Sequence, residues 1–122
     1  NKEFTLIGYS GGGAVALLLA SRSKEVKRVI TIAGNLDTNK WTSPHKVTAL
    51  EYSLNPSDYT NKLENIEQFH LIGKKDKVVP EDIFLSYFSK FKKKDKIKYL
   101  YVDSDHSCCW QVPYKTFLDE LK

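Results

Sequence analysis

The sequence lacks any apolar run long enough to cross a lipid bilayer. The longest candidate, Ala14 to Ala20, is flanked by glycines and by Ser21-Arg22, and it falls far short of the roughly 20 residues that a transmembrane helix needs. We therefore expect no membrane-spanning segment. With 41% hydrophobic and 28% charged residues, the 122-residue chain has the composition of one globular unit rather than of a disordered chain.

Cysteine is also scarce, since the chain has only two, adjacent at Cys108 and Cys109. Neighbouring cysteines cannot join distant parts of the chain, and they lack the spacing of a zinc site. The pattern favours two small side chains without a redox role, with a strained vicinal disulfide as the alternative. It predicts no bound metal.

Positive charge gathers in one stretch. The net charge is +4, and much of it lies between Lys90 and Lys98 (KFKKKDKIK), whereas the acidic residues are scattered. Recognition of nucleic acid by stacking needs aromatic residues interleaved with the basic ones on one surface, and Phe91 and Tyr99 are better explained as buried residues of their elements. The lysines are interpreted as a solvated helix end, so we expect no nucleic-acid partner.

Four short segments rich in β-branched and aromatic residues predict strands. They are Phe4 to Tyr9, Val29 to Ala33, Phe69 to Gly73 and Ile97 to Val102. Helical or irregular segments separate them, and this alternation is typical of an α/β protein with a parallel sheet.

Helical patterns occur between and after these strands. The predicted helices are Gly11 to Arg22, Glu81 to Phe91 and Tyr114 to Leu121. The first is apolar on all sides, so we expect it to be buried at the centre of a larger body. The connection from Gly34 to Ile66 is polar and broken by prolines. A connection of that length is usually functional, and it predicts a lid or a substrate-binding excursion.

The segment Gly8-Tyr9-Ser10-Gly11-Gly12 has the pattern G-x-S-x-G, directly between a predicted strand and a predicted helix. This is the context that the motif requires, because a sharp turn lifts the Ser10 hydroxyl above the sheet. The N–H of Gly11, at the positive end of the helix, is expected to donate to a developing oxyanion. A glycine-rich turn can also bind phosphate, but a P-loop carries a lysine beside its Ser or Thr, and this turn has none.

A serine nucleophile needs a base. The chain has three histidines: His45 in the long connection, His70 inside a strand, and His106 in the loop after the last strand. Parallel sheets carry their active sites at the carboxyl ends of their strands. His106 is therefore the predicted base.

A third residue has to accept a hydrogen bond from the imidazole and fix its tautomer. Asp76 follows the third predicted strand, again at the carboxyl end of the sheet, and it is the predicted acid. Asp37, after the second strand, is the alternative, because in such folds the acid sometimes follows the preceding strand. The two aspartates next to His106 are too close to it in sequence to orient its ring.

The chain order Ser10, Asp76, His106, with G-x-D-x-V-x-P around the aspartate, resembles the α/β-hydrolase superfamily over the whole chain. Three shorter segments are similar to a group of poorly characterised bacterial α/β hydrolases, some of them described as envelope lipoproteins. These segments are Ala33 to Asp37 with Trp41, Ser53 to Pro56, and Asp105 to Trp110.

This narrower resemblance implies that Asn35, Asp37 and Trp41 line the substrate site, together with Tyr9 of the motif. It leaves both the cytoplasm and the bacterial cell envelope open as locations.

The resemblance also implies that part of the domain is missing. A complete hydrolase of this fold has further strands before the nucleophile turn, and a loop after one of them supplies a second oxyanion donor. Without them, the strand Phe4 to Tyr9 would be an unpaired apolar edge. We expect residues 1–122 to be the C-terminal part of a single α/β-hydrolase domain, with the N-terminal half or a second chain packed along this edge.

The sequence thus predicts a serine hydrolase that cleaves a carboxylic ester or related acyl bond of a small-molecule substrate without a cofactor. Esterases, thioesterases, lipases and peptidases share this triad. Two alternatives come from other classes: a binding module that keeps the fold without activity, and a phosphate- or nucleic-acid-binding domain that rests only on the lysine cluster. The first is disfavoured because inactive relatives usually lose one triad residue, and all three are present here.

Overall fold

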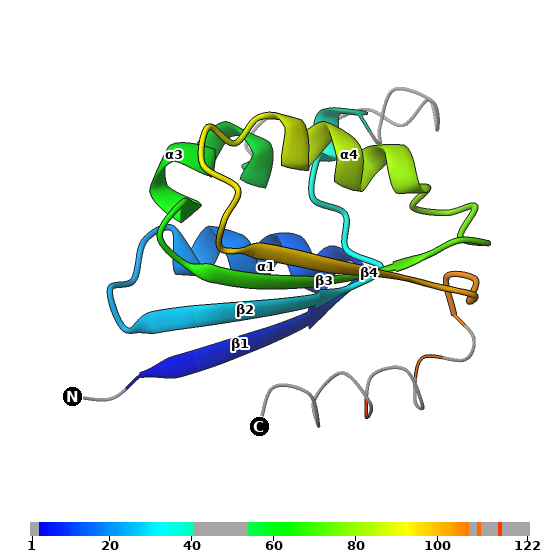
Figure 1. The fold of residues 1–122 in the computed structure, drawn as a ribbon, viewed down its shortest axis with the longest axis horizontal. Helices are drawn as coiled ribbons and strands as arrows, with labels where there is room; N and C mark the ends of the chain where they lie inside the picture. Colours follow the sequence, from blue (N-terminus) through cyan, green and yellow to red (C-terminus); the bar gives the residue numbers. More distant parts are fainter. Residues whose placement is uncertain (1–2, 41–53, 108–109, 111–114, 116–122) are drawn as a thin grey trace.

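The computed structural model describes residues 3–40, 54–107, 110 and 115. Within these residues four strands form one sheet in the order β1-β2-β3-β4, and every neighbouring pair is parallel. The strands are β1 (Phe4–Tyr9), β2 (Val26–Ile32), β3 (Glu67–Gly73) and β4 (Ile97–Val102). They lie side by side in Figure 1. The predicted α/β architecture with a parallel sheet is confirmed.

Two strands begin earlier than the sequence predicts, β2 at Val26 rather than Val29 and β3 at Glu67 rather than Phe69. The reason is a polar pair that interrupts the apolar pattern. Arg28 and Glu67 are partners in the register between the two strands, and their side chains form an ion pair with Nε and Oε2 3.1 Å apart.

The helices that lie wholly within the described residues are α1 (Gly11–Ala20), the 3-10 turn η1 (Pro56–Tyr59), the short α3 (Thr60–Leu63) and α4 (Glu81–Ser89). Helices α1 and α4 cover the same face of the sheet, as Figure 1 shows and as their shared core confirms. That core includes Leu17 and Ala20 of α1, and Phe84 and Tyr87 of α4. The predicted C-terminal helix lies outside the described residues.

Helix α1 is buried on one side only within the described residues, although its all-apolar sequence predicts burial at the centre of a larger body. Leu17 is fully buried, but Val15 and Leu19 are 56% and 54% exposed. Strand β1 stands at the edge of the sheet, and its Ile7 is 51% exposed. No element in the described part of the chain covers this side of α1 and β1, so the apolar edge predicted from the sequence is present.

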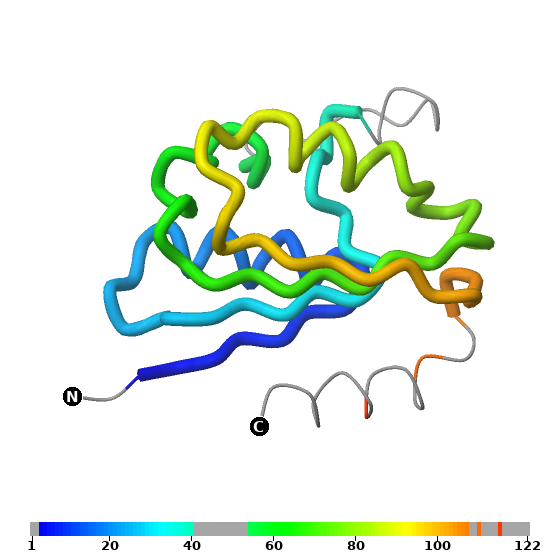
Figure 2. Tube along the Cα trace, in the orientation of Figure 1, coloured from blue at the N-terminus to red at the C-terminus, as the bar shows by residue number. Residues whose placement is uncertain are grey.

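The long connection leaves the carboxyl end of β2 and returns through η1 and α3 to the start of β3 (Figure 2). The Asn55 side chain caps η1 by accepting from the N–H of Ser57, and Leu63 packs in the core. Residues 41–53 lie outside the described part, so the predicted lid or excursion stays a prediction.

Candidate active site

Ser10 occupies the turn between β1 and α1 with φ 54° and ψ −122°. Positive φ is uncommon for a residue other than glycine, and it is typical of strained functional turns. The turn is so tight that a Cβ added to Gly8 would lie 2.2 Å from the carbonyl oxygen of Gly12. This close approach explains the first glycine of the G-x-S-x-G motif.

His106 lies between Ser10 and Asp76. Its Nε2 is 2.9 Å from the Ser10 Oγ, and its Nδ1 is 2.8 Å from the Asp76 Oδ2. The imidazole is 17% exposed and the Asp76 side chain is fully buried. The structure thus brings together the three residues that the sequence predicts as nucleophile, base and acid.

The carboxylate of Asp76 is fixed by the backbone that follows it. Its Oδ1 accepts from the N–H groups of Val78 and Val79, at 2.9 and 2.7 Å. One oxygen is therefore held by the loop while the other faces the imidazole. Gly73 makes room for this arrangement, because a Cβ there would lie 2.5 Å from the Ser104 carbonyl and 3.3 Å from the Asp76 Cβ.

The loops after β3 and β4 are joined by backbone hydrogen bonds. The N–H of Lys74 donates to the Val102 carbonyl at 2.8 Å, and that of Lys75 donates to the Ser104 carbonyl at 3.1 Å. Because these loops carry Asp76 and His106, the hydrogen bonds set the distance between the two side chains.

Tyr9 and Trp110 both hold the backbone of His106. The Tyr9 hydroxyl donates to the His106 carbonyl, and its ring centroid is 5.4 Å from that of the imidazole. The Trp110 Nε1 donates to the same carbonyl at 3.2 Å. Tyr9 was expected to contact substrate, and its place beside His106 adds this second contact. The role of Trp110 was missed, since only its closeness in sequence to His106 hinted at it.

An open cleft of about 790 Å³ lies beside the imidazole. It is lined by Lys74, Lys75, Asp76, Lys77, Val78, Asp105, His106 and Ser107. Lys75 pairs with Asp103 at 3.2 Å, and both side chains are largely exposed, as expected of solvated loop charges. The cleft gives His106 access to solvent.

Asn35 lies next to the nucleophile. Its backbone N–H donates to the Ser10 carbonyl at 3.1 Å. Its side-chain Oδ1 is buried and has no hydrogen-bond donor among the described residues. That Asn35 lines the substrate site stays a prediction. Trp41, which was also expected to line the site, lies outside the described residues.

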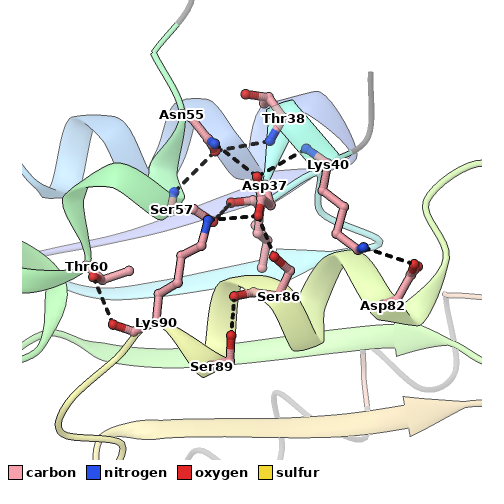
Figure 3. Close-up of polar contacts among 11 residues, drawn as sticks. Asp37, Thr38, Lys40, Asn55, Ser57, Thr60, Asp82, Ser86, Ser89 and Lys90 are labelled. Atoms are coloured by element: carbon pink, nitrogen blue, oxygen red, sulfur yellow. Dashed lines mark hydrogen bonds and ion pairs between the residues drawn. The ribbon is translucent and has the colours of Figure 1, made fainter. Parts of the chain in front are cut away.

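Asp37 has a different position, in a buried polar network between the long connection and α4 (Figure 3). One carboxylate oxygen accepts from the Asn55 Nδ2 at 3.0 Å and the Lys40 N–H at 3.3 Å. The other accepts from the Ser86 Oγ at 2.6 Å and the Lys90 Nζ at 3.0 Å.

Four donors thus occupy the Asp37 carboxylate. The Nδ1 of His106 is paired with Asp76 instead. Burial favours a higher pKa for Asp37, but the hydrogen bonds outweigh it and lower the pKa to about 2. The structure does not support Asp37 as the alternative acid. That it lines the substrate site stays a prediction.

The other two histidines do not take part in this arrangement. His70 is fully buried in β3, and burial lowers its pKa to about 3. His45 lies outside the described residues. Among the described residues, no group of three or more His, Cys, Asp or Glu side chains is arranged to hold a metal ion. No described helix is long and apolar enough to cross a membrane.

Residues 3–115 match the family Serine hydrolase (FSH1). No curated protein matches the chain. Among solved structures, an esterase from Pyrococcus furiosus superposes with a TM-score of 0.76 at 18% identity, with coverage of 99% of this chain and 52% of the esterase.

Two further structures share the fold. An acylaminoacyl peptidase from Pyrococcus horikoshii superposes with a TM-score of 0.78 at 13% identity. The superposition covers 98% of this chain and 23% of the peptidase. A monoacylglycerol lipase from Paleococcus ferrophilus has a TM-score of 0.65 at 15% identity, with coverage of 98% and 68%. The chain spans about half the length of the Pyrococcus furiosus esterase.

Proposed function

The chain belongs to the Serine hydrolase (FSH1) family, and from that premise we propose that Ser10, His106 and Asp76 act as a catalytic triad on a carboxylic ester or related acyl bond. The observation that carries the proposal is the continuous row of hydrogen bonds from the Ser10 hydroxyl through both imidazole nitrogens to the Asp76 carboxylate. Nucleophile, base and orienting acid are recognised by such geometry.

In the proposed reaction the Ser10 Oγ forms a bond to the acyl carbon while the His106 Nε2 takes its proton. The tetrahedral intermediate collapses, the bond to the leaving group breaks, and Nε2 returns the proton to that group. Water then attacks the acyl carbon while Nε2 takes its proton. The bond from the acyl carbon to the Ser10 Oγ breaks, Nε2 returns the proton to Oγ, and the carboxylic acid leaves. Asp76 accepts from Nδ1–H throughout and stabilises the imidazolium.

Gly11 is the proposed oxyanion donor. It is the first residue of α1, where backbone N–H groups have no partner within the helix and the helix dipole favours negative charge. No atom outside its neighbourhood lies within 4 Å of the position that a Cβ on Gly11 would take. An acyl oxygen bonded to the Ser10 nucleophile would develop its charge close to this end of the helix.

Residues 1–122 are further proposed to be the C-terminal part of a single α/β-hydrolase domain. The support is the coverage of about half the esterase of the same fold, together with the exposed apolar side chains of β1 and α1. A preceding segment that pairs with β1 would cover both and would supply a second oxyanion donor. Removing one such donor costs about a hundredfold or more in rate.

Labelling of Ser10 tests the proposed chemistry. A fluorophosphonate applied to the full-length protein should bind covalently to Ser10, and Ser10→Ala should abolish labelling. Ser21→Ala is the matched control, because it removes a hydroxyl at the other end of α1, where it donates to the Leu18 carbonyl. Equal labelling of the wild type and Ser10→Ala would exclude this nucleophile.

Expression of residues 1–122 alone tests the proposed domain organisation. We expect self-association through the exposed edge, measurable by analytical ultracentrifugation, and ester turnover at least about a hundredfold below that of the full-length protein. A stable monomer with full turnover would refute the missing half.

A further inference from the structure

One short segment of β2 and its following turn holds the backbone of Ser10 from both sides. The Ser10 N–H donates to the Ile32 carbonyl at 2.9 Å, and the Ser10 carbonyl accepts from the Asn35 N–H at 3.1 Å. In a regular parallel ladder, two such partners of one residue stand two positions apart. Here they stand three apart, so the segment contains one extra residue, as in a β-bulge.

Ala33 supplies the unusual backbone conformation of this bulge. Its φ is 50°, and it shares a positive φ with Ser10 alone among the described residues other than glycine. The side chain is 4% exposed, and the backbone N–H donates to the Leu71 carbonyl of β3 at 2.9 Å. A strained conformation persists only where its surroundings fix it, and here the third strand of the sheet does so.

The same segment contacts the helix that follows the nucleophile. A Cβ added to Gly13 would lie 3.2 Å from the Gly34 Cα, so the first turn of α1 packs directly against the bulge. The Gly13 N–H also donates to the Ser10 carbonyl, at 3.0 Å. Ser10 is therefore enclosed between its own helix and the bulge, with its main-chain N–H and C=O both engaged.

We propose that the bulge at residues 32–35 positions the nucleophile, and that Ala33 and Asn35 are positioning residues that act through the backbone of Ser10. This inference rests on the proposed role of Ser10. The φ of 54° at Ser10 is costly for a residue with a side chain, and the bulge supplies two of the hydrogen bonds that keep it. If the bulge relaxes, the hydroxyl leaves its position 2.9 Å from the His106 Nε2, and displacement of about 1 Å costs up to a hundredfold in rate.

Substitutions at Ala33 test the proposal in full-length protein, with fluorophosphonate labelling of Ser10 as the readout. Ala33→Val should lower the maximal labelling rate about tenfold without changing the concentration for half-maximal rate, because a β-branched residue strongly disfavours positive φ. Ala33→Gly should label at least as fast as wild type, because glycine adopts this conformation freely.

Ala20→Val is the matched control. Ala20 is as buried as Ala33 but lies in α1, away from the turn, so the same added methyl groups should lower the midpoint of thermal unfolding and leave the labelling rate unchanged. Wild-type labelling of Ala33→Val would overturn the proposal. So would an equal loss in Ala20→Val, since reactivity would then follow stability alone.

A second pair of variants separates the backbone of Asn35 from its side chain. Asn35→Pro removes the N–H that donates to Ser10, whereas Asn35→Ala keeps it. The proposal expects a larger loss of labelling rate in the proline variant, and equal losses would overturn it. If the proline variant does not fold, the Ala33 variants decide. A wild type that does not label at Ser10 would refute the proposed function itself, whereas a labelled wild type with no effect at Ala33 would refute only the bulge.

Discussion

His106 and His70 are both imidazoles with a hydrogen-bonding partner on each ring nitrogen, yet their surroundings differ in charge and in access to solvent. One partner of His106 is a carboxylate and the other a serine hydroxyl, and its ring is partly exposed. The partners of His70 are the Thr31 Oγ1 at 2.6 Å and the Gln68 Oε1 at 3.0 Å, both uncharged, and its ring is fully buried.

The difference fits the proposed role of His106, because a general base needs more than two hydrogen bonds. A carboxylate beside the ring stabilises the imidazolium that forms during proton transfer, and an open cleft allows substrate and protons to reach it. A hydroxyl and an amide in a dry core offer neither, and burial then lowers the pKa of His70 to about 3. Location decides between them: His70 lies in the middle of β3, and His106 lies beyond the end of β4.

The largest effect that the comparison predicts is on activity at His106. His106→Gln in the full-length protein should lower ester turnover by about 10⁴-fold or more, because the triad acts as a unit. The midpoint of thermal unfolding is measured beside turnover, because the imidazole is only 17% exposed and its loss takes a partner from the buried Asp76 carboxylate. Turnover is measured with an activated ester such as p-nitrophenyl acetate, and a loss below tenfold would contradict the assignment.

A second prediction concerns the pH dependence set by His70. Between its ordinary pKa of 6.5 and its lowered pKa of about 3, the unfolded chain binds a proton that the folded protein does not. The free energy of unfolding therefore falls as pH drops through this window, by about 1.4 kcal/mol per unit from this group. Urea unfolding at pH 7, 6, 5 and 4 measures it.

His70→Leu should flatten that part of the profile, although it also lowers stability at pH 7 because the Gln68 and Thr31 side chains lose a partner. Parallel profiles for the wild type and His70→Leu would contradict the prediction. The activity of each folded molecule at pH 7 should stay unchanged, in contrast to His106→Gln.

A smaller effect of pH on the free energy of unfolding is expected at Asp37, which is an acid, whereas His70 is a base. Its pKa is lowered from 3.8 to about 2, so its contribution is fully present above pH 3.8 and is lost as pH falls toward 2. The shift corresponds to a free energy of unfolding on the order of 2 kcal/mol. Asp37→Asn should be less stable than wild type at pH 7, and the difference should shrink at pH 2 in urea unfolding. An equal difference at both pH values would contradict the cause.

The sheet and the site were predictable from the sequence to different degrees. All four strands, α1 and α4 follow from apolar periodicity, because that pattern reports burial directly, whereas η1 and α3 lie in a segment that the sequence analysis treats as an irregular connection. The early starts of β2 and β3 could not be predicted in this way. Arg28 and Glu67 are polar, so the sequence alone favours a loop there, and their ion pair across the two strands appears only in the structure. The spacing of Ser10, Asp76 and His106 predicted which side chains meet, because strands of a parallel sheet end at one edge.

Other contacts have no signal in a single sequence. The network of Asp37 joins residues about 50 positions apart, and the positive φ of Ala33 occurs at a residue that normally avoids it. Both depend on how distant segments pack, which propensity does not encode.

The smallest predicted effect is at Tyr9. Its substitution distinguishes a residue that holds the His106 backbone from one that contacts substrate. The Tyr9 hydroxyl donates to the His106 carbonyl, and Trp110 donates to the same oxygen, so Tyr9→Phe leaves that oxygen one partner and keeps the ring. A neutral hydrogen bond of this kind contributes about 1 kcal/mol, which corresponds to about a fivefold fall in the rate constant for turnover. The Michaelis constant should hardly change if Tyr9 acts only by steadying the loop, and it should rise if the hydroxyl also contacts substrate. Steady-state kinetics of Tyr9→Phe on a small ester decides between these roles, with Tyr59→Phe in η1 as the control for loss of a tyrosine hydroxyl away from the site. A loss as large as that of His106→Gln would place Tyr9 in the chemistry itself and would contradict the view that His106 is held from several sides.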